Sequence, residues 1–265
     1  MLTLTNKIFA DRWKNFQITF RALQSRNYRL FYSGQFISLI GTWMQQIAVS
    51  WLIYRMTNSV FLLGLVGFIS QFPTFVISPF AGVWSDQMNK HRILIWTQAL
   101  SMIQALTLSV LVLSGAITVW QIVLLSFFLG GINAFDVPAR QSFLIDMIDN
   151  RQDLGNAIAL NSAMFNGTRF IGPFVAGILI AALGEGICFL INGLSYSAVI
   201  AALLAMRLAH TGKGIRKSGL LESLTEGFHY VFRDSKMRSI LFLMALTSIM
   251  GVPVIVLMPA FAKDI

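Results

Sequence analysis

Few charged residues lie inside or beside the apolar stretches of this sequence, and each is a candidate for chemistry. Arg169 is a cation within the apolar segment NGTRFIGPFVAG, while Asp136 and Arg140 place opposite charges at the end of another such segment. An ionisable side chain in this setting is costly unless it faces a cavity or has a partner. Arg169 can therefore line a cavity or pin two helices together. Asp136 can carry a coupling proton or form a helix-end ion pair.

A second set of candidates consists of uncharged polar side chains on one helical face of residues 30–54. They recur at i, i+3, i+7, i+10 and i+11, and they are Gln35, Ser38, Thr42, Gln45 and Gln46. Amides and hydroxyls can line a wet cavity, or they can join neighbouring helices by hydrogen bonds. Asn133, in a different apolar run, is a further candidate of the same kind.

The residues that enzymatic chemistry requires are not grouped in this sequence. It contains no G-x-x-x-x-G-K-[ST] phosphate-binding loop, and none of its three histidines, His91, His210 and His229, has a second metal ligand at i+3 or i+4. Cys188 is the only cysteine, so no internal disulfide or cysteine cluster can form. We therefore expect no enzyme activity, no cofactor and no metal site.

Membrane spans are the elements that must position these side chains. Hydrophobic residues make up 56% of the 265-residue chain, charged residues only 12%, and the mean hydropathy is +0.70, which is too apolar for a water-soluble domain. Seven apolar runs are long enough to cross a bilayer, namely 30–54, 60–84, 93–114, 119–137, 157–183, 187–206 and 239–261. The sequence therefore predicts an all-α membrane protein.

The basic residues gather on one side of these spans. Seventeen of the 20 Lys and Arg residues fall in four segments on the same side, namely 1–29, 85–92, 138–156 and 207–238. The positive-inside rule places these segments and the N-terminus in the cytoplasm. The net charge of +9 then reflects membrane topology and not nucleic-acid binding. We expect a multi-pass protein of the plasma (inner) membrane, in contact with the lipid bilayer.

Four regions follow one another along the chain. They are a basic cytoplasmic N-terminus, a six-helix transmembrane bundle, a cytoplasmic linker and a seventh transmembrane helix, at 1–29, 30–206, 207–238 and 239–265. Apolar residues recur at helical spacing within 7–29 and within 220–231. Both stretches are predicted to form amphipathic helices at the membrane surface.

The segment GVWSDQMNKHR, residues 82–92, joins two predicted spans on the basic side. Gly82 allows close helix packing, Asp86 can cap a helix start, and Lys90 and Arg92 are cations near the membrane surface. The segment resembles the G-x-x-x-D-[RK]-x-G-[RK]-[RK] loop of the major facilitator superfamily of secondary transporters. Three positions depart from that pattern: Gln87, Asn89 and His91. The resemblance implies an inner gate formed by Asp86, Lys90 and Arg92, and a tight turn that obeys the positive-inside rule is the alternative.

The segment that contains Arg169 also resembles a motif of this superfamily, the antiporter motif G-x-x-x-G-P-x-x-G-G of its fifth helix. Three residues match it: Gly172, Pro173 and Gly177. Thr168 and Ala176 replace two of its glycines. Small residues at every fourth position let another helix approach closely, and a proline bends or loosens a helix. In the family this face packs against the opposite half and helps to seal the outer gate, so we expect its partner to come from sequence beyond the last residue.

The segment NAFDVPARQSF, residues 133–143, is similar to the branch of the superfamily that includes the enterobactin exporter and related secretion effectors. Pro138 is expected to stop the helix there. In the family, helices 1 and 4 face the central cavity, which implies substrate contacts for Gln35, Thr42, Gln45 and Gln46, with Asn133 in the fourth span a further candidate. Arg169, in the fifth span, is a candidate because a charge near the middle of the bilayer is costly unless it faces a cavity or a partner. Asp136 and Arg140 are assigned to gating at the inner boundary.

The resemblance implies the six-helix N-terminal half of a major facilitator bundle plus its seventh helix. The implied function is proton-coupled efflux of a drug, siderophore or metabolite by alternating access. We expect no transport without the C-terminal half, because a site formed between two halves cannot alternate alone. A fragment, a truncated gene product and a self-pairing half are open alternatives. A seven-span receptor or scaffold that does not transport is the alternative function, and a membrane enzyme lacks any paired nucleophile and base.

Overall fold

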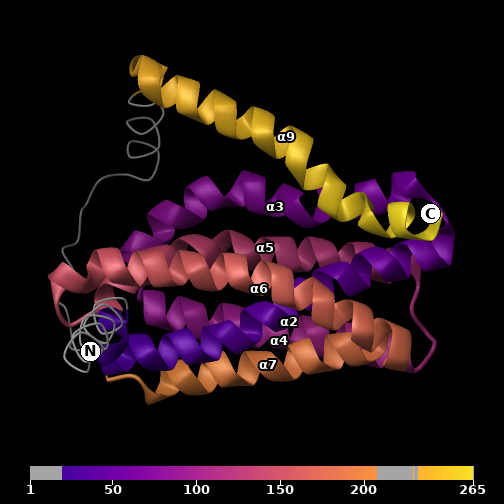
Figure 1. Cartoon of the computed structure of the whole chain (residues 1–265), viewed down its shortest axis with the longest axis horizontal. Coiled ribbons are helices and arrows are strands. Elements are labelled where there is room, and N and C mark those ends of the chain that lie inside the picture. Colours follow the sequence, from indigo (N-terminus) through magenta and orange to yellow (C-terminus); the bar gives the residue numbers. More distant parts are fainter. Residues whose placement is uncertain (1–19, 208–228, 230–231, 265) are drawn as a thin grey trace, which may run out of the picture.

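Helices form every long element that the structure describes. The computed structural model describes residues 20–207, 229 and 232–264 (Figure 1). Six of its helices are long and apolar enough to cross a membrane. They are α2 (Arg26–Thr57), α3 (Val60–Gln87), α4 (Lys90–Leu113), α5 (Val119–Phe143), α6 (Leu154–Leu183) and α7 (Glu185–Ala205). Four of them contain a predicted span, and α4 and α7 each end one residue before theirs does, so the prediction of an all-α membrane protein is confirmed.

One further long helix and three short turns complete the described part. Helix α9 (Ser235–Asp264) covers the seventh predicted span, and short 3-10 helices lie at η1 (Arg21–Gln24), η2 (Leu144–Met147) and η3 (Arg151–Asp153). Of the surface helix predicted in the linker at 220–231, only residue 229 is among the described residues. Most of the surface helix predicted at 7–29 also lies outside them.

Side-chain caps explain where several of these helices begin. The Ser59 hydroxyl accepts a hydrogen bond from a backbone N–H in the first turn of α3, and Thr118 forms a full capping box with Gln121 at the start of α5. Helix α4 is capped by Asn89, whose side-chain oxygen accepts from the backbone N–H three residues later at 3.3 Å. The expected helix cap at Asp86 is therefore wrong, because α3 continues past that residue.

Prolines do not end the helices in this bundle. Helix α5 passes through Pro138 and continues to Phe143, so the predicted stop at Pro138 is wrong. Helix α6 likewise runs without a break through Pro173. A proline removes one backbone hydrogen bond, here the one that the Arg169 carbonyl would otherwise accept. Membrane helices tolerate this loss where neighbouring groups satisfy the freed carbonyl.

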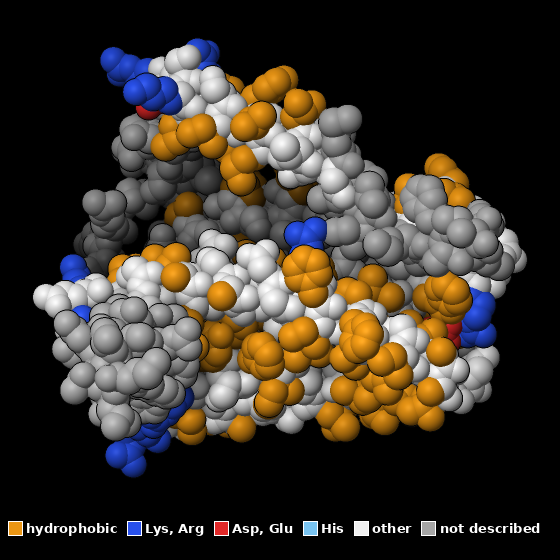
Figure 2. Space-filling view, viewed as in Figure 1, with side chains coloured by type: hydrophobic (Ala, Val, Ile, Leu, Met, Phe, Trp, Pro, Cys, Tyr) orange, Lys and Arg blue, Asp and Glu red, His pale blue; other side chains and the backbone are white. Residues whose placement is uncertain are grey.

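Helix α2 occupies the middle of the bundle. It packs along α7 and α6, while α3 packs along α5, and α4 contacts both α7 and α5 (Figure 1). Helices α3 and α6 are the least enclosed, because only 17% of their most apolar window is buried, against 44% in α2, α4 and α7. On the face shown in Figure 2, hydrophobic side chains cover the middle of the bundle, and Lys and Arg lie mostly toward its left end.

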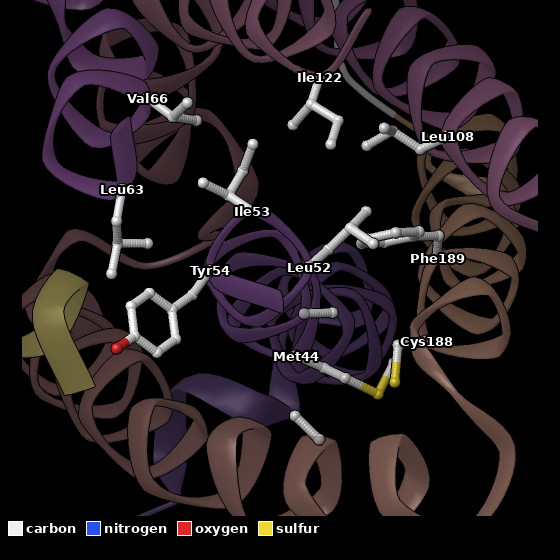
Figure 3. Close-up of a cluster of buried hydrophobic side chains, with 12 residues drawn as sticks. Met44, Leu52, Ile53, Tyr54, Leu63, Val66, Leu108, Ile122, Cys188 and Phe189 are labelled. Carbon is white, nitrogen blue, oxygen red and sulfur yellow. The ribbon is translucent and has the colours of Figure 1, made fainter. Parts of the chain in front are cut away.

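Two clusters of apolar side chains fill the interior of the bundle. One joins α2 to α3, α4, α5 and α7 and includes Leu52, Ile53, Leu108, Ile122 and Phe189 (Figure 3). The other lies at the opposite end of α2. Lipid tails are as apolar as these side chains, so burial from water does not favour their association. Close van der Waals packing and interhelical hydrogen bonds must hold the helices together.

The small-residue face of α6 packs against α2. Thr168 and Ala176 are fully buried, and Gly172 lies so close to α2 that an added Cβ would come within 2.4 Å of the Cβ of Trp43. The expectation that this face has its partner beyond the end of the sequence is therefore wrong. The motif of small residues marks where two helices of this bundle cross.

The segment before α2 contacts protein at one end of the bundle. Arg21 forms an ion pair with Asp153 at 2.8 Å, and the backbone N–H of Ala22 donates to Asn156 Oδ1 at 2.9 Å. Helix α2 already begins at Arg26, so the last residues of the predicted surface helix belong to a span instead. These contacts tie the start of α2 to the start of α6.

The opposite end of the bundle carries an ion pair between α2 and α7. Arg55 Nε donates to Glu185 Oε1 at 2.8 Å, and a terminal guanidinium nitrogen donates to Oε2 at 3.1 Å. The Glu185 side chain is buried, with 6% exposed, whereas 58% of the Arg55 side chain is exposed. Glu185 also lies in the first turn of α7, where the helix dipole favours a negative charge.

Replacement of Gly172 by alanine should destabilise the bundle, because the added methyl group would overlap Trp43. Overpacking of this kind costs about 1–3 kcal/mol. The matched control is Gly167→Ala on the same helix, where no described atom lies within 4 Å of an added Cβ. That change should leave stability unchanged or raise it by up to about 1 kcal/mol, since alanine favours a helix more than glycine does. Unfolding in mixed micelles, followed by circular dichroism, measures both, and equal effects would contradict the close crossing.

Loss of the Arg55 guanidinium should lower stability through the buried carboxylate that it leaves behind. Hydrogen bonds to charged groups contribute about 1.5–3 kcal/mol, and the exposure of Arg55 reduces this to about 1 kcal/mol for Arg55→Gln. Arg55→Lys should recover only part of the loss, because an ammonium group cannot bind both oxygens side by side. Thermal unfolding in detergent, with the exposed Arg151→Gln as control, tests this. A lysine variant as stable as wild type would rule out the two-point contact.

Candidate functional site

A cavity of about 620 Å³ lies between α2, α3 and α5, with contributions from α4, α7 and α9. Its volume is typical of small-molecule binding sites. The polar side chains that line it are Thr42, Gln45, Gln46, Ser50, Ser70, Gln71, Gln104, Ser126, Asn133, Tyr196 and Ser248. No charged side chain is found among the described residues of this lining. The cavity can therefore hold a ligand through amide and hydroxyl hydrogen bonds and apolar contacts.

Four of the six predicted substrate contacts meet at this cavity. Thr42, Gln45 and Gln46 reach it from α2, and Asn133 reaches it from α5. Gln46 is exposed in the described structure, so its amide has free donors and acceptors for a ligand. The Thr42 hydroxyl is partly engaged, since it donates to the Ser38 carbonyl at 3.0 Å.

Gln45 combines the two roles that the sequence left open. Its side-chain nitrogen donates to Gln104 Oε1 at 3.0 Å, and its oxygen accepts from Asn192 Nδ2 at 2.7 Å. Gln104 in turn donates to the Leu125 carbonyl at 3.3 Å. This chain of amides links α2, α4, α5 and α7 beneath the cavity. Gln45 is thus a structural hydrogen-bonding residue that also forms part of the cavity wall.

Gln35 lies away from the cavity. Its side chain is inside the bundle, with the residue only 2% exposed, and its Oε1 has no hydrogen-bond partner among the described residues. Ser38, the next polar residue on the same face of α2, is also buried. The polar face of α2 is therefore divided between packing at one end and the cavity at the other.

Arg169 also lies outside the cavity lining, on an exposed side of α6. Its guanidinium carbon lies 5.7 Å from the centre of the Trp43 ring, which is the geometry of a cation–π contact, and Trp43 meets Phe165 edge-on. Asn166 and Ser162 are exposed on the same helix and continue this polar face. Because lipid is a costly surrounding for a cation, this side of α6 must border protein or water in the membrane.

Asp136 lies at the centre of a buried polar cluster that joins α5 to α4. The residue is 2% exposed and forms an ion pair with Arg140, one helical turn later. Its Oδ1 accepts hydrogen bonds from the Thr97 hydroxyl at 2.7 Å and from Gln98 Nε2 at 2.8 Å. This geometry matches the ion-pair alternative, since each oxygen of the carboxylate already has a partner. Sequence reasoning did not identify Thr97 and Gln98.

The predicted gate cations differ in their surroundings. Lys90 Nζ donates to the Ser142 carbonyl at 3.4 Å and lies 3.9 Å from an oxygen of Asp146, so it links the start of α4 to the region after α5. Arg92 is exposed. The side chain of Asp86 lies outside the described part of the structure, and its gate role stays a prediction.

The predicted gate glycines, Gly82, Gly172 and Gly177, differ in how closely other helices approach them. Gly172 and Pro173 lie where α6 crosses α2, as described above. Gly82 and Gly177 have no atom within 4 Å of an added Cβ in the described structure, so neither marks a helix crossing there. Both positions remain open for contact with other segments.

Several polar residues of the cavity were missed by sequence reasoning. Gln71, Gln104 and Tyr196 belong to three different spans, and each is a polar group within a mainly apolar run. The signal in the sequence was their cost in lipid, which applies to uncharged amides as well as to charges. Their convergence on one point depends on helix packing and could not be read from spacing along the chain.

Comparison with known proteins gives consistent relatives. Residues 18–265 match the family model of the transmembrane secretion effectors. The chain is 30% identical over 181 residues to the staphyloferrin A transporter of Staphylococcus aureus, covering 68% of this chain and 45% of that protein. It is 23% identical over 202 residues to the multidrug efflux pump Tap of Mycolicibacterium fortuitum, covering 73% of this chain and 49% of that protein. It is 19% identical over 258 residues to macrolide efflux protein A of Streptococcus pyogenes, covering 96% of this chain and 61% of that protein.

These relatives are longer than the present chain, which spans about half the length of the curated proteins it matches. No solved structure matches it significantly. The family model nevertheless covers nearly the whole chain, from the turn before α2 to the last residue. Together with the six membrane-length helices and the polar cavity between them, this match shows that the chain belongs to the transmembrane secretion effector family of the major facilitator superfamily.

Proposed function

We propose that this chain forms one half of an exporter that moves small organic molecules across the plasma (inner) membrane by alternating access. The observation that carries this is the 620 Å³ cavity, which lies among membrane-length helices and is lined by uncharged polar and apolar groups. Relatives named as a multidrug efflux pump, a macrolide efflux protein and a staphyloferrin A transporter support the proposal of export. The N-terminus and the basic loops face the cytoplasm, as the positive-inside rule requires.

The other half of the exporter covers the exposed sides of α3 and α6. These two helices are the least buried of the six, and α6 carries Arg169, Asn166 and Ser162 on an exposed face. Lipid is a poor partner for such a face, whereas a second bundle with water between the halves is a good one. The greater length of the relatives leaves room for such a bundle.

Proton coupling completes the mechanism that we propose. Asp136 is a carboxylate buried within helix α5, toward the end of the bundle where η1 lies, and it is paired with Arg140. Protonation of Asp136 would release Arg140, and re-pairing would follow loss of the proton. Such an exchange links a proton to the position of two neighbouring helices.

Transport of defined compounds tests the proposed function. The chain, alone and together with a second six-helix bundle, is reconstituted in vesicles with a proton gradient. A macrolide, staphyloferrin A and ethidium are the trial substrates. We expect uphill export only when both bundles are present, with loss of export when a protonophore collapses the gradient. Ligand binding without any flux in the two-bundle protein would favour the receptor alternative and overturn the exporter.

Arg169→Leu in the two-bundle transporter should reduce export at least 100-fold while insertion stays normal. Leucine costs nothing in lipid but provides no charge for a cavity or a partner, and 100-fold corresponds to about 2.7 kcal/mol. Phe170→Leu, at the neighbouring exposed position, is the matched control for a change in side-chain shape. Initial efflux rates per inserted molecule give the comparison. Wild-type rates from a well-inserted leucine variant would remove Arg169 from the site.

Asp86→Asn should shift the transporter toward the state that opens to the cytoplasm, because the inner gate loses its negative charge. The chain is suited to a labelling test, since its only cysteine, Cys188, is fully buried. A reporter Gln46→Cys is placed in the cavity on a Cys188→Ser background. Asp86→Asn should speed its reaction with a charged thiol reagent added from the cytoplasmic side by about tenfold, the effect of about 1.4 kcal/mol on the gate equilibrium. Unchanged labelling would contradict the gate.

A further inference from the structure

A second, smaller cavity lies apart from the proposed transport cavity. It has a volume of about 280 Å³ and lies between α2, α5 and α6, toward the end of the bundle where η1 is found. Its polar lining consists of Arg140, Gln141, Asn161 and Ser162, and apolar side chains complete it. It shares no lining residue with the 620 Å³ cavity. Whatever it binds is therefore bound at a separate site.

Arg140 gives this cavity its charge. The guanidinium has five N–H donors, and one terminal nitrogen is paired with Asp136. Its Nε is buried and has no hydrogen-bond partner among the described residues. Asp136, by contrast, also accepts from Thr97 and Gln98, so its negative charge is shared among three donors. The guanidinium therefore retains capacity for another acceptor.

The other polar residues of the lining also favour a negatively charged ligand. No acidic side chain is among the described residues that line the cavity. Gln141, Asn161 and Ser162 each carry a donor, and none of these three side chains makes a hydrogen bond to another described residue. The buried Nε of Arg140 still lacks an acceptor, and a carboxylate can accept from a guanidinium through two parallel hydrogen bonds.

We propose that this cavity is an anion site that binds the carboxylate of a small organic acid. The volume admits a short organic acid but lies below the range of drug-sized sites. Such an anion competes with Asp136 for Arg140. Binding of the anion therefore weakens the ion pair between these two residues of α5. This proposal is independent of the proposed export, because anion binding to the chain can be measured whether or not the chain takes part in transport.

Calorimetric titration of the purified chain in nanodiscs at low ionic strength tests this proposal, with malonate as the probe. We expect one malonate per chain and no binding of the uncharged malonamide. Asp136→Asn should tighten malonate binding at least threefold, because the internal competitor loses its charge. Asn161→Leu should weaken binding about fivefold. Arg151→Gln removes a cation from the same end of the bundle outside the cavity, so its affinity should equal that of wild type.

Arg140→Gln should weaken malonate binding at least tenfold. Because this change leaves Asp136 buried without its cation, the double variant Asp136→Asn with Arg140→Gln serves where the single variant does not fold, and it should be equally weak. Three results would overturn the site. They are an unchanged malonate affinity in the Arg140 variants, a loss of affinity in Arg151→Gln equal to theirs, and weaker malonate binding in Asp136→Asn. Binding of inorganic phosphate in place of malonate would overturn its assignment to carboxylates.

Discussion

The close approach of helices to α2 is the interaction on which the rest of the bundle depends. In lipid, apolar side chains gain little by leaving their surroundings, so helices associate only where their surfaces fit closely or exchange hydrogen bonds. Gly172 provides the fit on one side of α2, where α6 crosses within contact of Trp43. On another side, Gln45 and Asn192 join α2 to α7 by an amide hydrogen bond of 2.7 Å. Both the 620 Å³ cavity and the 280 Å³ cavity are bounded by the helix that these contacts hold.

The polar groups of the bundle divide into those with protein partners and those without. Asp136 and Gln45 are buried and bonded to side chains on neighbouring helices, and Glu185 is bonded to Arg55 at the opposite end of α2 from η1. Gln46 and Arg169 remain exposed. A buried polar group in a membrane protein needs its partner for stability, whereas an exposed one is tolerated only beside water or another polar surface. The first group therefore describes how the bundle is held, and the second describes where it meets a ligand or another segment.

The sequence predicted the helices well because a bilayer demands about 20 apolar residues in every span, and this demand leaves a strong local signal. It failed where the answer depended on a tertiary neighbour. The stripe of small residues around Gly172 predicted a close helix contact correctly but could not say which helix makes it. Pro138 was assigned the role it has in water, although α5 continues through it. Arg55 and its partner Glu185 are 130 residues apart, so no rule of local spacing pairs them. The candidates Thr42, Gln45, Gln46 and Asn133 meet at one cavity, whereas Gln35 and Arg169, chosen by the same reasoning, do not.

The pairing of Asn27 with Arg207 has a mechanical consequence. The Asn27 side chain both donates to and accepts from the backbone of Arg207, at 2.9 Å and 3.1 Å, although the two residues are 180 positions apart. The start of α2 and the end of α7 are thus joined to each other, and Arg26 adds a further hydrogen bond to the Ala205 carbonyl at 3.1 Å. A pull on the chain that follows Arg207 acts first on the start of α2 and, through Arg21 and Asp153, on the start of α6. The end of α7, where the linker begins, is therefore held beside the start of α2.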